Sequence, residues 1–153
     1  MNAATLITTY LLSAALAGVA GAFALSLVMR LIARAGEGGD MVEALGSLLT
    51  GSLDNARVVG RLLHVLSAVG FGLVYTLLMV ALGMTAWPHA LFTGLGFGAF
   101  HGIVVSLGLV WVVADNHPVE RYRRSSPTVF VAHFAGHVAY GAVVGLVVAL
   151  SPL

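Results

Sequence analysis

The stretch LLHVLSAVGFGLVYTLLMVALGMTAWPHALFTGLGFGAFHGIVVSLGLVWVVA, residues 62–114, contains no aspartate, glutamate, lysine or arginine. A helix needs about 20 apolar residues to cross the hydrocarbon core of a bilayer, so this stretch has the length of two crossings. Trp87 and Pro88 divide it, because tryptophan favours the membrane interface and proline favours the first turn of a helix. The stretch therefore predicts two membrane-spanning helices joined by a tight turn.

The charge-free stretches 3–29 and 125–153 flank this pair, and each is long enough for one more crossing. The composition agrees, since 59% of the residues are hydrophobic and 8% are charged, whereas a soluble domain carries about 25% charged residues. The sequence therefore predicts an all-α membrane protein, a single domain over residues 1–153 that forms a four-transmembrane-helix bundle. We expect the spans near residues 4–33, 60–84, 89–114 and 127–150.

The arginines set the predicted orientation, because loops rich in lysine and arginine remain in the cytoplasm. We expect a bacterial inner-membrane protein with its charged loops in the cytoplasm, and with both termini and the turn at 84–88 outside. Arg30 falls inside a predicted span, and we expect its side chain to reach the headgroups as an anchor. All seven positive residues flank the same two loops: Arg30, Arg34, Arg57, Arg61, Arg121, Arg123 and Arg124.

The first charged loop predicts a short amphipathic helix near residues 40–50. Asp40 and Glu43 have the spacing of a helix N-terminal cap, and the apolar residues that follow share one face. Such a helix lies on the membrane surface, either as a lid or docking element or simply with its apolar side in the bilayer. Ser52, Asp54 and Asn55 offer caps for a second long helix that starts before its membrane span. Ser126 and Pro127 likewise predict the start of the last span, as N-cap and first helical residue.

Charge and cysteine content remove several functional classes. The net charge is +1, so no basic surface exists that could bind the phosphates of a nucleic acid. The absence of cysteine excludes disulfides, thiolate metal ligands and thiol nucleophiles. The expected partners are the lipid bilayer and either a larger membrane complex or further copies of the chain. An enzyme is the least favoured class, because no nucleophile is paired with a base.

The 19 glycines predict close helix packing, because small residues four apart let helix backbones approach each other in lipid. Such ridges are Gly94, Gly98 and Gly102; Gly141 and Gly145; Gly18 with Ala22; and Gly72 with Ala68 and Thr76.

A weak internal repeat accompanies the glycine ridges. His64-Val65 followed by Gly72-Leu-Val recurs as His137-Val138 followed by Gly145-Leu-Val. The repeat predicts a duplicated helical hairpin, with its two halves related by an axis along the membrane normal and with His64 and His137 in equivalent positions.

The six histidines are the main chemical lead. We expect His89 and His117 to be solvated, because each lies beside a proline in a turn or loop. The other four lie in predicted spans, where an ionisable side chain is costly and indicates function: His64, His101, His133 and His137.

Three interpretations of these four histidines stay open. His133 and His137 are four apart, a spacing that lets two imidazoles of one helix bind one transition-metal ion. A pair of histidines on facing helices would instead suit the iron of haem b. In the third interpretation each histidine forms a hydrogen bond with a hydroxyl or a backbone carbonyl and ties helices together.

The chain resembles the YagU-like proteins, small bacterial inner-membrane proteins without an assigned activity. The resemblance covers most of the chain, and it implies four membrane helices but no mechanism. It rests on Gly18 to Met29, Asp40-Met41 to Leu45-Gly46, His64 before Gly70 to Tyr75, His101, and Tyr140-Gly141 to Gly145.

The favoured function is a small accessory or binding subunit with an intramembrane histidine cluster. The alternative is a small oligomeric transporter or channel. Small multidrug exporters couple transport to protons through an acid inside the membrane, and the predicted spans contain none.

Overall fold

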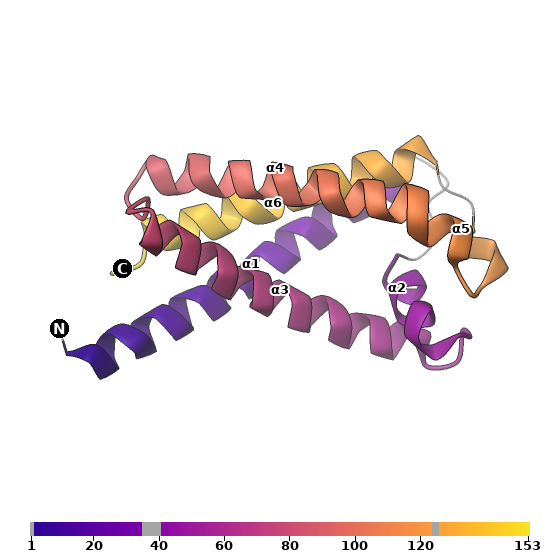
Figure 1. Ribbon diagram of the computed structural model, residues 1–153, viewed down its shortest axis with the longest axis horizontal. Coiled ribbons are helices and arrows are strands. Elements are labelled where there is room, and N and C mark those ends of the chain that lie inside the picture. The colour runs from indigo at the N-terminus through magenta and orange to yellow at the C-terminus, as the bar shows by residue number, and fades with distance from the viewer. Residues whose placement is uncertain (1, 35–40, 124–125) are drawn as a thin grey trace.

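The computed structural model describes residues 2–34, 41–123 and 126–153, and Figure 1 shows a bundle of long helices. Within these residues, four helices are long and apolar enough to cross a membrane. The all-α four-helix bundle is thus confirmed, and by the length and composition of these helices the chain is a multi-pass membrane protein. In chain order the elements are α1 (Ala3–Arg34), α2 (Met41–Thr50), α3 (Ala56–Ala81), α4 (His89–Gly108), a π-helical turn (Leu109–Val113), α5 (Ala114–Asn116), a 3-10 turn (Glu120–Tyr122) and α6 (Pro127–Ala149).

Gly83 ends α3 before its predicted bound at residue 84. This glycine has a left-handed backbone conformation (φ 67°). Its N–H donates to Val80 O (3.1 Å), and the N–H of Met84 donates to Met79 O (2.8 Å). These two bonds form the Schellman motif, in which a glycine after the last helical residue lets the chain turn back over the helix end.

The predicted start of α6 agrees with the structure. Ser126 is the N-cap of α6, where its Oγ accepts a hydrogen bond from the Val129 N–H (3.4 Å), and Pro127 is the first helical residue. The predicted amphipathic helix is α2. Its expected cap, Asp40, lies outside the described residues.

A few pairs of helices make most of the packing contacts. The main contacts are those of α4 with α6, of α6 with α1, of α1 with α3, and of α2 with α3. Helices α3 and α4 are joined by a short turn but make few contacts, and they separate toward their other ends (Figure 1). The pairing of α1 with α3 and of α4 with α6 is what a duplicated hairpin needs, although the repeat itself stays a prediction.

Glycines set the closest approach of α4 to α6. A Cβ atom on Gly94 would lie 2.2 Å from Gly141 O, and one on Gly141 would lie 2.1 Å from Gly94 O. Alanine could not fit at either position without moving a helix backbone. The predicted glycine ridges therefore pack inside this bundle, where they allow extensive dispersion contact between the helices.

Glycines also allow α2 to pack closely against the start of α3. A Cβ on Gly46 would lie 1.7 Å from Ala56 O, and one on Gly60 would lie 1.8 Å from Val42 O. Ala56 is fully buried beneath α2. Helix α3 begins at Ala56, directly after Asn55, one of the three predicted caps, and four residues before the expected span. This close packing places α2 across one end of the bundle.

Hydroxyl groups connect the helices by donating to backbone carbonyls of their neighbours. Tyr140 Oη donates to Ala68 O (2.6 Å), which joins α6 to α3. Ser106 Oγ donates to Phe130 O (3.2 Å), which joins α4 to α6. Such bonds between membrane helices contribute about 0.6 kcal/mol each, and they satisfy polar groups for which lipid offers no partner.

Candidate functional site

A cavity of about 940 Å³ lies at the end of the bundle that carries Arg30, Arg57 and Arg61, called here the arginine end. Its volume is near the upper end of the range of about 300–1,000 Å³ for small-molecule and cofactor sites. Side chains from α1, α2, α3, α4 and α6 line the cavity, and most of them are apolar. All four histidines that the sequence places in the spans also line it: His64, His101, His133 and His137.

The two α6 histidines are oriented by their own helix. His133 Nδ1 lies 2.9 Å from Val129 O, and His137 Nδ1 lies 2.7 Å from His133 O. A carbonyl oxygen only accepts hydrogen bonds, so both Nδ1 atoms carry the proton and both Nε2 atoms keep a lone pair. Metal-ligating histidines have the same arrangement. His137 is half-buried, whereas His133 is only 8% exposed, so His137 is better placed to contact a ligand.

His101 on α4 lines the cavity beside His137. Its Nδ1 lies 3.0 Å from Tyr75 Oη, and Tyr75 donates its single hydroxyl proton to Phe97 O (3.0 Å). His101 Nδ1 must then donate to the tyrosine oxygen, so its Nε2 also keeps a lone pair. The ring centroids of His101 and His137 are 4.6 Å apart at an angle of 66°. A porphyrin therefore has no room between these two rings.

His64 approaches the cavity from α3. Its Nε2 lies 3.2 Å from Ser26 Oγ, and this hydrogen bond connects α3 to α1. His64 thus ties two helices together, as the third interpretation of the histidines expected. That the four histidines act as one cluster stays a prediction.

The described residues offer no ready site for a bare metal ion. Among them, no group of three or more histidine, aspartate or glutamate side chains could hold one. Among the described residues, two pairs of imidazole rings lie close together: His101 with His137, with ring centroids 4.6 Å apart, and His137 with His133, with centroids 6.4 Å apart. A structural zinc ion usually takes four protein ligands, so pairs favour a metal that brings most of its own ligands.

The arginines of this cavity are not among the site residues predicted from the sequence, because Arg30 at a span end is expected to be a lipid anchor. Arg30, Arg57 and Arg61 all line the cavity, and none of its described lining residues is acidic. The missed signal is a spacing: Arg57, Arg61 and His64 recur at intervals of four and three residues, which places them on one face of a helix.

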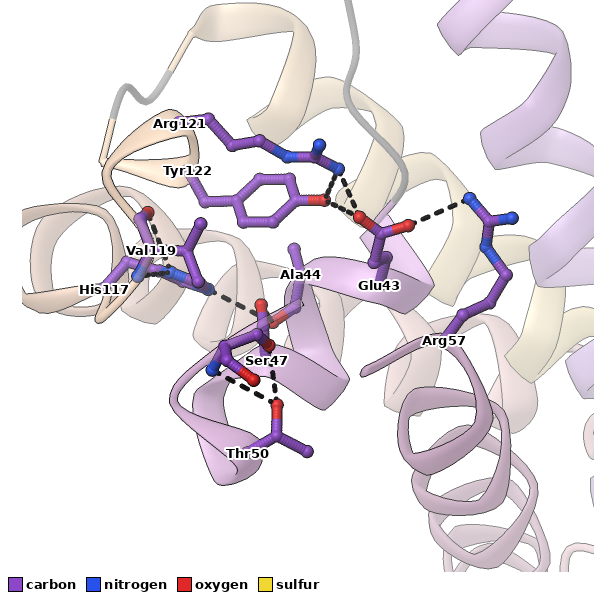
Figure 2. Close-up of polar contacts among 10 residues, drawn as sticks. Glu43, Ala44, Ser47, Thr50, Arg57, His117, Val119, Arg121 and Tyr122 are labelled. Atoms are coloured by element: carbon purple, nitrogen blue, oxygen red, sulfur yellow. Dashed lines mark hydrogen bonds and ion pairs between the residues drawn. The ribbon is translucent and has the colours of Figure 1, made fainter. Parts of the chain in front are cut away.

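Glu43 holds α2 over the arginine end (Figure 2). Its carboxylate accepts a hydrogen bond from Arg57 on α3 (2.9 Å), and it also pairs with Arg121 from the second charged loop. Tyr122 Oη lies 3.1 Å from the same carboxylate. Burial raises the pKa of Tyr122; the hydrogen bond from Arg121 opposes this shift, and the contact with Glu43 adds to it.

His117 is buried, which contradicts the prediction that it is solvated. Only 2% of its surface is exposed, because α2 packs against it. The Val119 N–H donates to His117 Nδ1 (3.1 Å), so Nε2 carries the proton and donates to Ala44 O in α2 (3.1 Å). His89, by contrast, is exposed as predicted.

Comparisons with protein-family models, with curated proteins and with solved structures found no match.

Proposed function

We propose that the protein is a small haem-binding subunit, in which a histidine of the cavity ligates the iron of haem b. One observation carries the proposal: imidazoles with a free Nε2 lone pair line a large apolar cavity that also contains arginines. Haem needs these features together, because its iron takes axial imidazoles, its ring is apolar and its propionates are acidic.

Haem fits the site better than a bare ion does. A porphyrin supplies four nitrogen ligands, so the protein needs to add only one or two, and the described residues offer imidazoles in pairs. His137 and His101 are the preferred ligands, since both are half-buried and both direct Nδ1 toward an acceptor. Because their rings are in contact, we expect one of them to bind the iron from one face of the haem.

His133 and His64 complete the set of candidate cofactor-binding residues. His133 lies one helical turn from His137 and is a second possible donor to the same metal. His64 lines the cavity from α3 and is hydrogen-bonded to Ser26. When bound, haem would supply one-electron redox chemistry, which suits an accessory subunit of a larger membrane complex or a homo-oligomer.

We also propose the location and kinship of the protein. The seven arginines support an inner-membrane orientation with the arginine end and α2 in the cytoplasm, and with both termini outside. The cavity then opens toward the cytoplasmic half of the bilayer. The sequence segments quoted above support kinship with the YagU-like proteins.

The first test is a visible absorption spectrum of protein purified gently in detergent, before and after titration with haemin. We expect a Soret band that saturates at one haem per chain in the wild-type protein. The band should be lost or shifted in His137→Ala or, if His101 is the ligand, in His101→Ala. It should persist in His89→Ala, which removes an exposed histidine at the opposite end. Circular dichroism checks that each variant keeps its helices.

Two results would overturn the proposal. Wild-type protein that binds haemin no better than the His101→Ala/His137→Ala double variant would exclude ligation at this site. Flux of a solute through the protein in liposomes, without haem binding, would support the transporter or channel instead.

A further inference from the structure

Arg30 and Arg61 occupy matching places on two helices of the cavity. On α3, Arg61 precedes His64 by three residues, and on α1, Arg30 follows Ser26 by four. His64 and Ser26 are hydrogen-bonded to each other at 3.2 Å. Both arginines therefore lie about one helical turn, or roughly 5 Å along the helix, from the contact between Ser26 and His64. Both lie on the side of this contact that faces the arginine end.

These two arginines are available to a ligand. Both are exposed and both line the cavity. Among the hydrogen bonds and ion pairs of the described residues, neither takes part in any, whereas Arg57 pairs with Glu43. No described acid lines the cavity to neutralise them. The cavity thus has a positive end and, beyond it, an apolar interior with imidazoles.

We propose that Arg30 and Arg61 bind the carboxylates of an amphiphilic ligand, which for haem are its two propionates. This inference rests on the proposed function and adds the direction of binding: the acidic edge lies at the arginine end and the ring extends toward His101 and His137. A guanidinium matches a carboxylate through two parallel hydrogen bonds, and two arginines from two helices match two carboxylates.

A phospholipid also carries an acidic group, but it fits this cavity less well. Its phosphate could bind the same arginines, yet its acyl chains have no use for imidazole lone pairs. The free Nε2 atoms of His101 and His137 lie in the same cavity as the arginines. A ligand that combines carboxylates with a metal uses both sets.

The test compares haem with its dimethyl ester, in which both carboxylates are blocked. Wild-type protein should bind haem more tightly than the ester. The Arg30→Gln/Arg61→Gln variant should bind haem about tenfold more weakly for each arginine removed, and it should bind the ester as the wild type does. Arg30→Lys/Arg61→Lys should recover part of the affinity for haem, since it keeps the charges but loses the paired hydrogen bonds.

A matched control is Arg123→Gln, which removes the same charge from a residue that does not line the cavity. It should leave both affinities unchanged. Equal losses for haem and ester in the arginine variant, or no loss for either, would refute the role of the arginines while haem binding itself stands. Loss of co-purified phosphatidylglycerol from that variant, with unchanged haem affinity, would refute it in favour of lipid. If wild-type protein binds neither haem nor ester, the proposed function fails and this inference with it.

Discussion

Replacement of Gly141 by alanine should separate α4 from α6 and destabilise the bundle. The new Cβ would lie 2.1 Å from Gly94 O, whereas ordinary contact begins at 3.4 Å, so the backbones must move apart by about 1.3 Å. Overpacking of this kind costs about 1–3 kcal/mol. The higher helix propensity of alanine returns at most about 1 kcal/mol, so we expect a net loss of stability.

Gly96→Ala is the matched control, because a Cβ on Gly96 would have no atom within 4 Å. The same change of residue in the same helix pair should then be neutral, or stabilising by up to about 1 kcal/mol. The assay is equilibrium unfolding in mixed micelles with increasing SDS, followed by circular dichroism. If Gly141→Ala and Gly96→Ala have the same free energy of unfolding, the packing argument is wrong.

Two further predictions concern the contacts around α2. Glu43→Gln should weaken the packing of α2 by about 1 kcal/mol or less, since the arginines that Glu43 pairs with are half-exposed. The amides of Met41–Thr50 should then exchange hydrogen faster in the variant than in the wild-type protein, while those of α6 exchange at the same rate in both. An unchanged exchange rate in Met41–Thr50 would contradict this prediction. Because burial raises the pKa of Tyr122, its neutral form should stabilise the fold fully below about pH 10. That contribution should be lost as the pH rises through the pKa of the folded state, so stability should fall more steeply there in wild-type protein than in Tyr122→Phe, and equal slopes would contradict the assignment.

The number of helices and most of their ends could be predicted because they depend on local composition. Charge-free length gives the spans, and the Ser126-Pro127 pair gives the start of α6. The end of α3 could also be predicted, since Gly83 follows the helix at the place where a left-handed C-terminal cap requires glycine. The start of α3 at Ala56 follows Asn55, one of the predicted caps, but the close packing of α2 on Ala56 is a tertiary contact that local composition does not show.

The site was predicted only in its residue types. Position in the spans singled out the four histidines, but it could not show that His133 and His137 donate Nδ1 to their own helix or that His101 contacts His137. His117 was misjudged because its partner, Ala44 O, is far away in the sequence. The arginines were missed because a positive residue at a span end usually serves as an anchor, and only the cavity reveals a second use.

Histidine ligation of haem can be tested by a resonance Raman spectrum of the ferrous protein reconstituted with haem, with and without ¹⁵N-labelled histidine. We expect an iron–histidine stretching band that shifts on labelling and disappears in His137→Ala or, if His101 is the ligand, in His101→Ala, while His89→Ala retains it. A bound haem whose spectrum shows no label-sensitive band, or a band that survives in the His101→Ala/His137→Ala double variant, would contradict histidine ligation in this cavity.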